Sequence, residues 1–257
     1  MNMIGVQGYT IRDYIKTKEA FADTLRKLRK IGYTCLDHWI PAEMTAEEYK
    51  KMLADTDIKP LKVGSDVYTL LESPAKAVKD AEIMEVDLVT VLSIPKKMRG
   101  DKDGYSKFAA DLNKAGKILA KEGLRISYHT HAYEFASFGG VNGMDIIINE
   151  TENVYIVPDT YWVAAGGVNV TDFIRRLKGR CTTVDFKDYG IDVETENIGN
   201  VRRIFCEVGQ GNLNWPDIAR ACKETGVNTF LAEQDICKTD PFTSLEISYK
   251  YMKLLGL

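Results

Sequence analysis

Imidazole and carboxylate side chains follow several short β-branched runs, in positions where they could do acid–base or metal chemistry. His129 and His131 come directly after the run at residues 124–128, Asp159 follows the run at 154–158, and Glu233 follows 229–232. Because side chains two apart on an extended strand point to the same side, we expect the two imidazoles to face one site. Such nitrogen and oxygen ligands suit Mg²⁺, Mn²⁺, Co²⁺ or Zn²⁺. Either group can also remove a proton next to a carbonyl.

Each of these residues also has a structural interpretation. Asp159 could cap the helix that follows it, whereas glutamate is a poor helix cap, so Glu233 is the stronger candidate for metal or acid–base work. Lys187 follows the run at 182–186, where ordinary surface lysines are common, and His38 could be a hydrogen-bonded structural residue. The predicted catalytic residues are His129, His131, Glu233 and Lys187.

Polar and aromatic side chains close to other predicted strand ends could bind a sugar, because aromatic rings pack well against its C–H faces. Trp162 comes three residues after Asp159 and is the best candidate for a wall of the substrate site. The predicted substrate-binding residues are Gln7, Tyr9, His38 and Trp162. Only Arg12 and Lys187 stand near these positions as cations, so the sequence favours an unphosphorylated sugar.

The elements that must position these residues alternate regularly. Short apolar runs alternate with amphipathic stretches about every 30 residues, which predicts parallel βαβ units closing into a single (β/α)8 TIM barrel over residues 1–257. The predicted strands are 4–7, 34–36, 60–63, 88–92, 124–128, 154–158, 182–186 and 229–232. An open doubly wound sheet is the alternative, but it would want a glycine-rich phosphate loop after the first strand, and residues 7–10 (QGYT) are not that loop.

Helical patterns separate the strands. Thr45 and Glu48 fit a capping box at a helix start. The other predicted helices lie at about 21–31, 105–119, 169–177, 216–225 and 242–255. In a barrel of this kind the loops after the strands meet at one end, so the polar strand ends predict a single site there.

The composition bounds the class of partner. The chain has 257 residues, 34 Lys+Arg against 37 Asp+Glu, a formal net charge of -3 and 45% hydrophobic residues. A nucleic-acid-binding domain usually shows a basic excess, so we expect no nucleic-acid partner. Five irregularly spaced cysteines, a first segment resembling a strand and no long apolar run predict a cytoplasmic protein without membrane association. A homo-oligomer is the common case for such proteins.

Six short stretches combine polar strand ends with glycine turns: QGYTIRD (7–13), IGY (31–33), YHTHAYEF (128–135), DTYWVAAGG (159–167), VGQGNLNW (208–215) and EQD (233–235). In order and spacing they resemble the sugar phosphate isomerase/epimerase group of the xylose isomerase-like TIM barrels. Its corresponding patterns include QLYTVRD, YHNHDFEF, DTYW…GG and VGEGxxDW. The resemblance covers nearly the whole chain and implies the same barrel fold.

The resemblance also implies a divalent metal held by Glu, Asp, His and Glu from the fifth to the eighth strand. Asp159 and Glu233 match the sixth and eighth positions, but Asp185 stands where the HxKD pattern has histidine. On strand five the ligand is Glu134 or His131. The predicted metal ligands are Glu134, Asp159, Asp185 and Glu233. This acidic set favours Mn²⁺ or Mg²⁺, with Zn²⁺ or Co²⁺ as alternatives.

By the same resemblance we expect a sugar isomerase or epimerase that abstracts a proton α to a carbonyl. Two alternatives stay open: a related dehydratase or lyase acting on a keto-inositol or keto-glycoside, and a sugar-binding barrel that has lost catalysis, which Ala132 and Asp185 would explain. Hydroxypyruvate isomerisation has no specific residue in its favour. The three-zinc endonuclease IV reaction needs more histidines than the three present.

Overall fold

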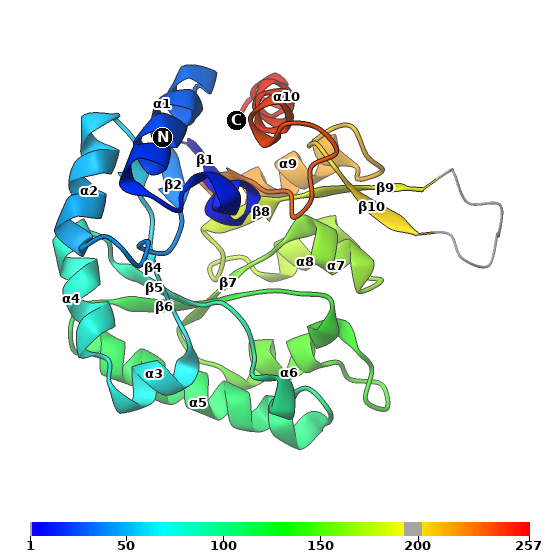
Figure 1. The fold of residues 1–257 in the computed structure, drawn as a ribbon. Coiled ribbons are helices and arrows are strands. Elements are labelled where there is room, and N and C mark those ends of the chain that lie inside the picture. Colours follow the sequence, from blue (N-terminus) through cyan, green and yellow to red (C-terminus); the bar gives the residue numbers. More distant parts are fainter. Residues whose placement is uncertain (1, 193–201) are drawn as a thin grey trace.

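A computed structural model describes residues 2–192 and 202–257 of the chain. Its helices surround a central set of strands (Figure 1). The strands are β1 (Met3–Gln7), β2 (Cys35–Asp37), β3 (Lys59–Pro60), β4 (Val63–Ser65), β5 (Leu88–Val91), β6 (Arg125–His129), β7 (Val154–Val157), β8 (Thr183–Phe186), β9 (Asp188–Ile191), β10 (Arg203–Cys206) and β11 (Thr229–Ala232).

The α-helices alternate with these strands along the chain. They are α1 (Lys18–Ile31), α2 (Ala46–Asp55), α3 (Val67–Glu72), α4 (Ala75–Met84), α5 (Lys102–Ala120), α6 (Gly143–Glu150), α7 (Thr160–Ala165), α8 (Val170–Arg176), α9 (Trp215–Thr225) and α10 (Pro241–Leu254). Short 3-10 helices are η1 (Gly8–Tyr14), η2 (Lys96–Met98) and η3 (Tyr133–Phe135). In the described part of the chain, none of the helices has the length and apolar character that crossing a membrane requires.

Two parallel arcs of strands form the barrel. One has the order β3-β2-β1-β11-β8 and the other β4-β5-β6-β7. At one seam, Asp159 and Asp185 form a parallel bridge, and the Asp185 amide donates to the Pro158 carbonyl at 2.9 Å. At the other seam, β3 and β4 are consecutive parts of one extended segment. The fold is therefore the (β/α)8 barrel that the sequence predicts.

The third barrel strand differs from the prediction, because residues 60–63 do not form one strand. Pairing stops at Pro60, which has no amide hydrogen to donate, and resumes at Val63 beside β5. The four helices α3, α4, α6 and α7 were not named from the sequence; each has only six to ten residues. The capping box at Thr45 and Glu48 is confirmed at the start of α2.

Close packing inside the barrel requires a glycine on β1. A methyl group built on Gly5 would collide with the side chain and carbonyl of Cys35 on β2 and with Leu231 on β11. We therefore expect Gly5→Ala to lower the free energy of unfolding by about 2 kcal/mol, the usual cost of overpacking a core. Gly100→Ala is the matched control, because nothing lies within 4 Å of its added carbon. Equal denaturation midpoints for the two variants would contradict this packing.

An antiparallel hairpin interrupts the alternation after β8. Strands β9 and β10 pair from Asp188 with Cys206 to Ile191 with Arg203, and they extend away from the barrel (Figure 1). The Arg203 guanidinium donates to the Ala165 carbonyl at the end of α7 at 2.6 Å. The hairpin thus brings residues from β10 next to the loop that follows β7.

Candidate active site

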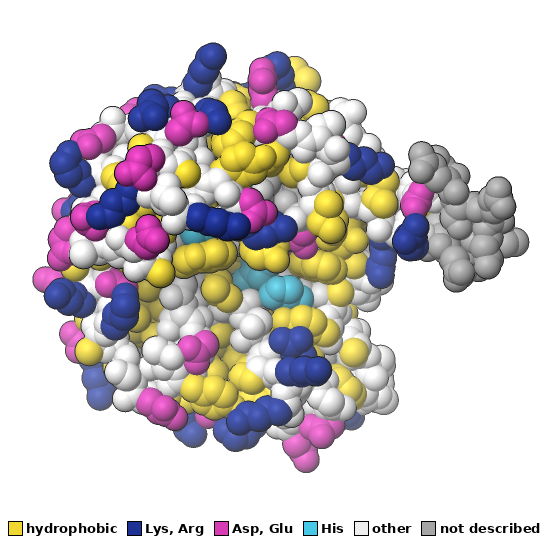
Figure 2. All heavy atoms as spheres, viewed as in Figure 1, with side chains coloured by type: hydrophobic (Ala, Val, Ile, Leu, Met, Phe, Trp, Pro, Cys, Tyr) yellow, Lys and Arg dark blue, Asp and Glu magenta, His cyan; other side chains and the backbone are white. Residues whose placement is uncertain are grey.

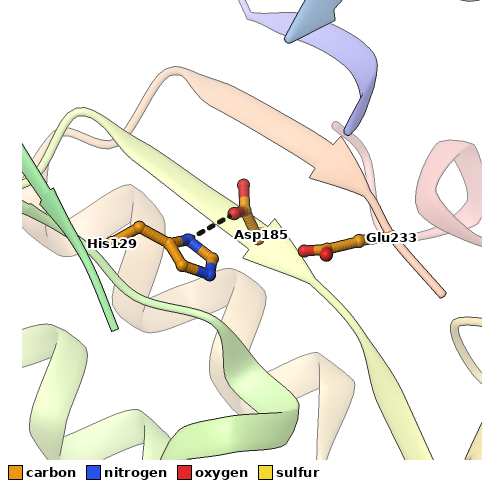
Figure 3. A group of neighbouring side chains, drawn as sticks. All are labelled: His129, Asp185 and Glu233. Carbon is orange, nitrogen blue, oxygen red and sulfur yellow. Dashed lines mark ion pairs between the residues drawn. The ribbon is translucent and has the colours of Figure 1, made fainter. Parts of the chain in front are cut away.

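Three buried side chains from three barrel strands converge at the carboxyl ends of those strands. His129 is the last residue of β6, Asp185 lies on β8, and Glu233 directly follows β11. The His129 Nδ1 lies 3.0 Å from Asp185 Oδ2, and one ligand atom from each residue lies within 4.8 Å of the others. Figure 3 shows the imidazole and the two carboxylates from these separate strands directed toward one another.

Two carboxylate oxygens of this cluster have no partner within residues 2–192 and 202–257. Among the described residues, neither Asp185 Oδ1 nor Glu233 Oε2 accepts a hydrogen bond or joins an ion pair, although both atoms are buried. Leaving a buried charged oxygen unpaired is costly, so such atoms indicate a missing ligand. One imidazole nitrogen and two carboxylates form a donor set that a divalent cation would bind. The cluster therefore fits a metal ion.

The acid groups of the cluster resist ionisation in the absence of a cation. Burial raises the pKa of Asp185 to about 7 and the pKa of Glu233 to about 8. The neighbouring carboxylates Asp159 and Asp185 raise the pKa of Glu233 further, while Lys187 opposes the shift. A divalent cation would remove this penalty, because opposite charge favours the ionised form of a carboxyl group.

Lys187 lies at the centre of the negative charge, and not at the surface. Its side chain is 1% exposed, and Nζ lies 2.7 Å from Asp159 Oδ2, 2.9 Å from Glu233 Oε1 and 2.8 Å from Asp235 Oδ1. These carboxylates hold the pKa of Lys187 well above its usual range, although burial opposes the shift. The three carboxylates therefore favour the ammonium form of Lys187.

Asp159 caps the helix that follows it, which is one of the two roles that its sequence position suggested, and it also pairs with Lys187. Its Oδ1 accepts from the Trp162 amide at 3.1 Å and caps α7, while Oδ2 pairs with Lys187. The Thr130 hydroxyl accepts from the Asp159 amide at 3.0 Å and fixes the backbone there. Asp159 is thus joined to the cluster through Lys187.

On strand five the structure brings His129 to the cluster, and it brings neither Glu134 nor His131. Both oxygens of Glu134 are already engaged: Oε1 accepts from the Tyr128 hydroxyl, and Oε2 accepts from the His131 amide at 2.9 Å. Burial raises the pKa of Glu134 to about 8. Glu134 therefore organises the loop after β6, and His129 is the residue of this segment that lies in the cluster.

His131 lies beside His129 and faces an aromatic group. Its ring is 4.8 Å from that of His129 and stacks on Tyr133 at 5.0 Å, with the Tyr133 hydroxyl 3.0 Å from Nδ1. Burial is the largest of the effects that lower the pKa of His131 to about 2. The imidazole is therefore uncharged at neutral pH. Trp162 lies 6.2 Å from His131.

Tyr161, Trp162 and Phe205 form an aromatic wall next to the cluster. Phe205, from β10, stacks on Tyr161 at 4.5 Å and lies 6.1 Å from Trp162. The Lys187 ammonium lies 5.4 Å from the centre of the Trp162 ring and 6.0 Å from that of Phe205. Near the centre of the view in Figure 2, histidine side chains appear among hydrophobic side chains.

The other predicted substrate residues lie at the same end of the barrel with contacts of their own. Gln7 accepts from the Tyr9 amide at 2.5 Å and starts η1, while Tyr9 is 40% exposed beneath the Arg12 guanidinium. His38 is buried, which lowers its pKa to about 4. It lines a cavity of about 300 Å³ with Trp39 on the flank of β4, and its buried Nε2 has no hydrogen-bond partner among the described residues.

Three residues in or near the site were not predicted as site residues from the sequence. Asp235 was read only as part of a motif, Phe205 reaches the site through the hairpin, and Lys62 forms a buried ion pair with Asp37 at 2.7 Å. The Lys62 charge lowers the pKa of Asp185, against the larger effect of burial. Lys62 lies in the break between β3 and β4, and its ion pair cannot be recognised from periodicity because its partner Asp37 comes from another strand.

Known proteins share this architecture. A sugar phosphate isomerase/epimerase from Parabacteroides distasonis ATCC 8503 aligns over 98% of this chain and 93% of its own, with a TM-score of 0.81 and 20% identity. The structure of an L-ribulose 3-epimerase gives 0.72 and 14%, over 99% and 94%. A xylose isomerase-like TIM barrel protein from Mycobacterium smegmatis, in complex with magnesium, gives 0.68 and 14%, over 99% and 96%.

At these identities the structural likeness establishes the fold and leaves the reaction to the site residues. No curated protein sequence matches the chain significantly. The sequence profile of the xylose isomerase-like TIM barrel family matches residues 25–236, which is most of the chain. The chain therefore belongs to the xylose isomerase-like TIM barrel family.

Proposed function

We propose that this protein is a metal-dependent isomerase or epimerase of a sugar or keto-sugar, which removes a proton from the carbon next to a carbonyl. The observation that carries the proposal is the buried cluster of His129, Asp185 and Glu233, in which two carboxylate oxygens lack a protein partner. The magnesium bound by the M. smegmatis barrel is consistent with a hard cation in this family, and Mn²⁺ or Mg²⁺ is our choice.

The proposed ligands are His129, Asp185 and Glu233. Asp159, which the sequence also predicts as a ligand, is connected to this cluster by its ion pair with Lys187. When bound, the cation would supply Lewis acidity that polarises the carbonyl and an adjacent hydroxyl of the sugar. Glu233 is our candidate for the base, because its Oε2 has no hydrogen-bond or ion-pair partner among the described residues. The Lys187 ammonium would stabilise negative charge that develops on the substrate oxygen.

Neutral His131 is assigned to substrate orientation. If the Tyr133 hydroxyl donates to its Nδ1, the other ring nitrogen carries the proton and can donate to a sugar hydroxyl. His129 is held by Asp185 and buried, so a role as ligand suits it better than a role as a mobile acid. Gln7, Tyr9 and His38 remain proposals for the outer part of the substrate site.

An unphosphorylated substrate agrees best with the cations near the site. Lys187 is surrounded by three carboxylates, and Arg12 donates to the carbonyls of Tyr9 and Asp235. Arg99 donates twice to the Ile94 carbonyl and lies 3.8 Å from the Tyr133 ring. Each of these cations has protein partners already, whereas a phosphate group needs donors that are free to converge on it.

The aromatic wall gives a prediction for substrate binding. Trp162→Ala removes the ring that faces His131 and Lys187, so we expect KM for the sugar to rise about tenfold, the equivalent of one aromatic contact. Trp162→Phe keeps a ring face and should recover most of that loss. Steady-state kinetics on both variants test the assignment, and an unchanged KM in Trp162→Ala would remove Trp162 from the substrate site.

Solvent deuterium incorporation tests the proposed reaction. Purified protein loaded with Mn²⁺ is incubated in D₂O with a panel of ketoses, keto-sugars and their phosphates, and each product is identified by NMR. We expect deuterium next to the carbonyl together with an isomer or epimer. An unsaturated product formed with loss of water would replace isomerisation by elimination. Absence of exchange across the panel, in protein shown to hold metal, would contradict an enzymatic function of this kind.

A further inference from the structure

The ammonium of Lys187 pairs with one of the proposed metal ligands. It lies 2.9 Å from Glu233 Oε1, on the carboxylate whose other oxygen is unpaired among the described residues, and 2.7 Å from Asp159 Oδ2. Divalent cations bind carboxylate oxygens at about 2.0–2.6 Å. A cation bound to Glu233 would therefore lie close to the ammonium, and the two charges would repel each other in a buried site.

The ammonium has a third carboxylate partner beside Asp159 and Glu233. Asp235 Oδ1 lies 2.8 Å from Nζ and is the most exposed of the three partners, with a side chain 19% accessible. The ring faces of Trp162 and Phe205 lie 5.4 and 6.0 Å from the ammonium, within the distance at which aromatic rings attract a cation. The lysine can therefore leave Asp159 and Glu233 without losing all of its favourable contacts.

The backbone of Lys187 is fixed, which confines such a movement to the side chain. The Thr160 hydroxyl accepts from the Lys187 amide at 2.9 Å and lies 2.8 Å from the Lys187 carbonyl. The four-carbon stem of lysine rotates freely at each bond. Only the ammonium end has to change place.

We infer that Lys187 is a built-in competitor of the divalent cation: it holds Asp159 and Glu233 while the metal is absent and moves to Asp235 and the aromatic wall when the metal binds. Lys187 thus sets the affinity of the site for metal. It also compensates buried carboxylates that would otherwise repel one another before loading. This inference rests on the proposed metal site and adds the residue that controls its occupancy.

Calorimetric titration with Mn²⁺ alone tests the inference without any measurement of activity. We expect Lys187→Met to bind Mn²⁺ about tenfold more tightly than the unaltered chain, because the competing charge is gone. Lys107→Met, an exposed lysine on α5, is the control and should bind as the unaltered chain does. Should Lys187→Met fail to fold by circular dichroism, Lys187→Gln serves for the same comparison.

Asp235→Asn separates movement of the lysine from simple charge repulsion. If the ammonium moves onto Asp235, this variant should weaken Mn²⁺ binding about fivefold in the unaltered background and have no effect beside Lys187→Met. An equal loss in both backgrounds would overturn the movement, since it would reflect only the missing negative charge.

The outcomes also separate this inference from the proposed function. Tighter binding in Lys187→Met, or binding in that variant alone, supports competition. Equal or weaker binding in Lys187→Met overturns the inference but leaves the metal site of the proposed function in place. No Mn²⁺ binding by either protein overturns the metal site itself, and the competition with it.

Discussion

Glu233→Gln should lower kcat for α-proton exchange by about a thousandfold, in the range expected when a general base is removed. The substitution keeps the shape of the side chain but removes its charge and its basicity. It also takes away one partner of Lys187 and one of the oxygens free to bind metal. We therefore expect Mn²⁺ affinity to fall together with kcat, as measured by deuterium exchange and calorimetry on the same preparation.

Glu246→Gln on α10 is the matched control, because Glu246 is exposed and pairs only with Lys250 one helical turn later. That variant should retain full exchange activity. If Glu233→Gln kept its activity while the control behaved normally, Glu233 would have neither of the roles assigned to it.

The second large effect is expected on stability, at Asp188. Its buried carboxylate accepts from the amides of Gly209, Gly211 and Leu213 at 3.0–3.2 Å and from the Trp215 indole at 2.6 Å. Asp188→Asn replaces one acceptor oxygen by a donor that faces other donors, and unsatisfied buried groups cost about 1–3 kcal/mol each. We expect the free energy of unfolding to fall by about 3 kcal/mol.

For a chain of this length, that change corresponds to a melting temperature lower by about 10 °C. Asp240→Asn provides the control, since Asp240 caps α10 at an exposed position where asparagine caps equally well. Similar melting temperatures for the two variants would mean that Asp188 does not hold the loop at 207–214 in place.

Much of the fold could be predicted because its determinants are local. Alternation of apolar runs and amphipathic stretches follows from strand and helix geometry, and the capping box at Thr45 and Glu48 lies within four residues. The interruption at Pro60 was missed, since one proline in an apolar run does not reveal where pairing resumes. The hairpin of β9 and β10 was also missed, because its paired residues are separated in the chain by the segment that connects the two strands.

The site was predicted less completely because its contacts are long-range. Asp159, Asp185 and Glu233 stand out as acidic residues at strand ends, and they do gather around Lys187 or His129. Glu134 looked equally suitable, but the hydroxyl of Tyr128, on the preceding strand β6, donates to one of its oxygens. The family pattern has a carboxylate on the fifth strand and a histidine on the seventh, whereas this site has His129 on the fifth and Asp185 on the seventh. This exchange becomes visible only in the structure, where the two side chains lie 3.0 Å apart.

That exchange changes how the missing histidine should be interpreted. The family pattern has histidine on the seventh strand, and Asp185 in its place suggested a weakened site. In the structure, the imidazole at the end of β6 faces that aspartate, which lies two strands away on β8. The proposed ligand set keeps one nitrogen donor, so an aspartate at position 185 is compatible with the proposed metal site.

The most direct test of the account is to locate Mn²⁺ by anomalous scattering in crystals grown at saturating metal concentration. We predict one strong anomalous peak in contact with His129, Asp185 and Glu233, with the Lys187 ammonium moved to Asp235. A peak elsewhere, or no peak at this place while Lys187 still pairs with Asp159 and Glu233, would contradict the proposed metal centre.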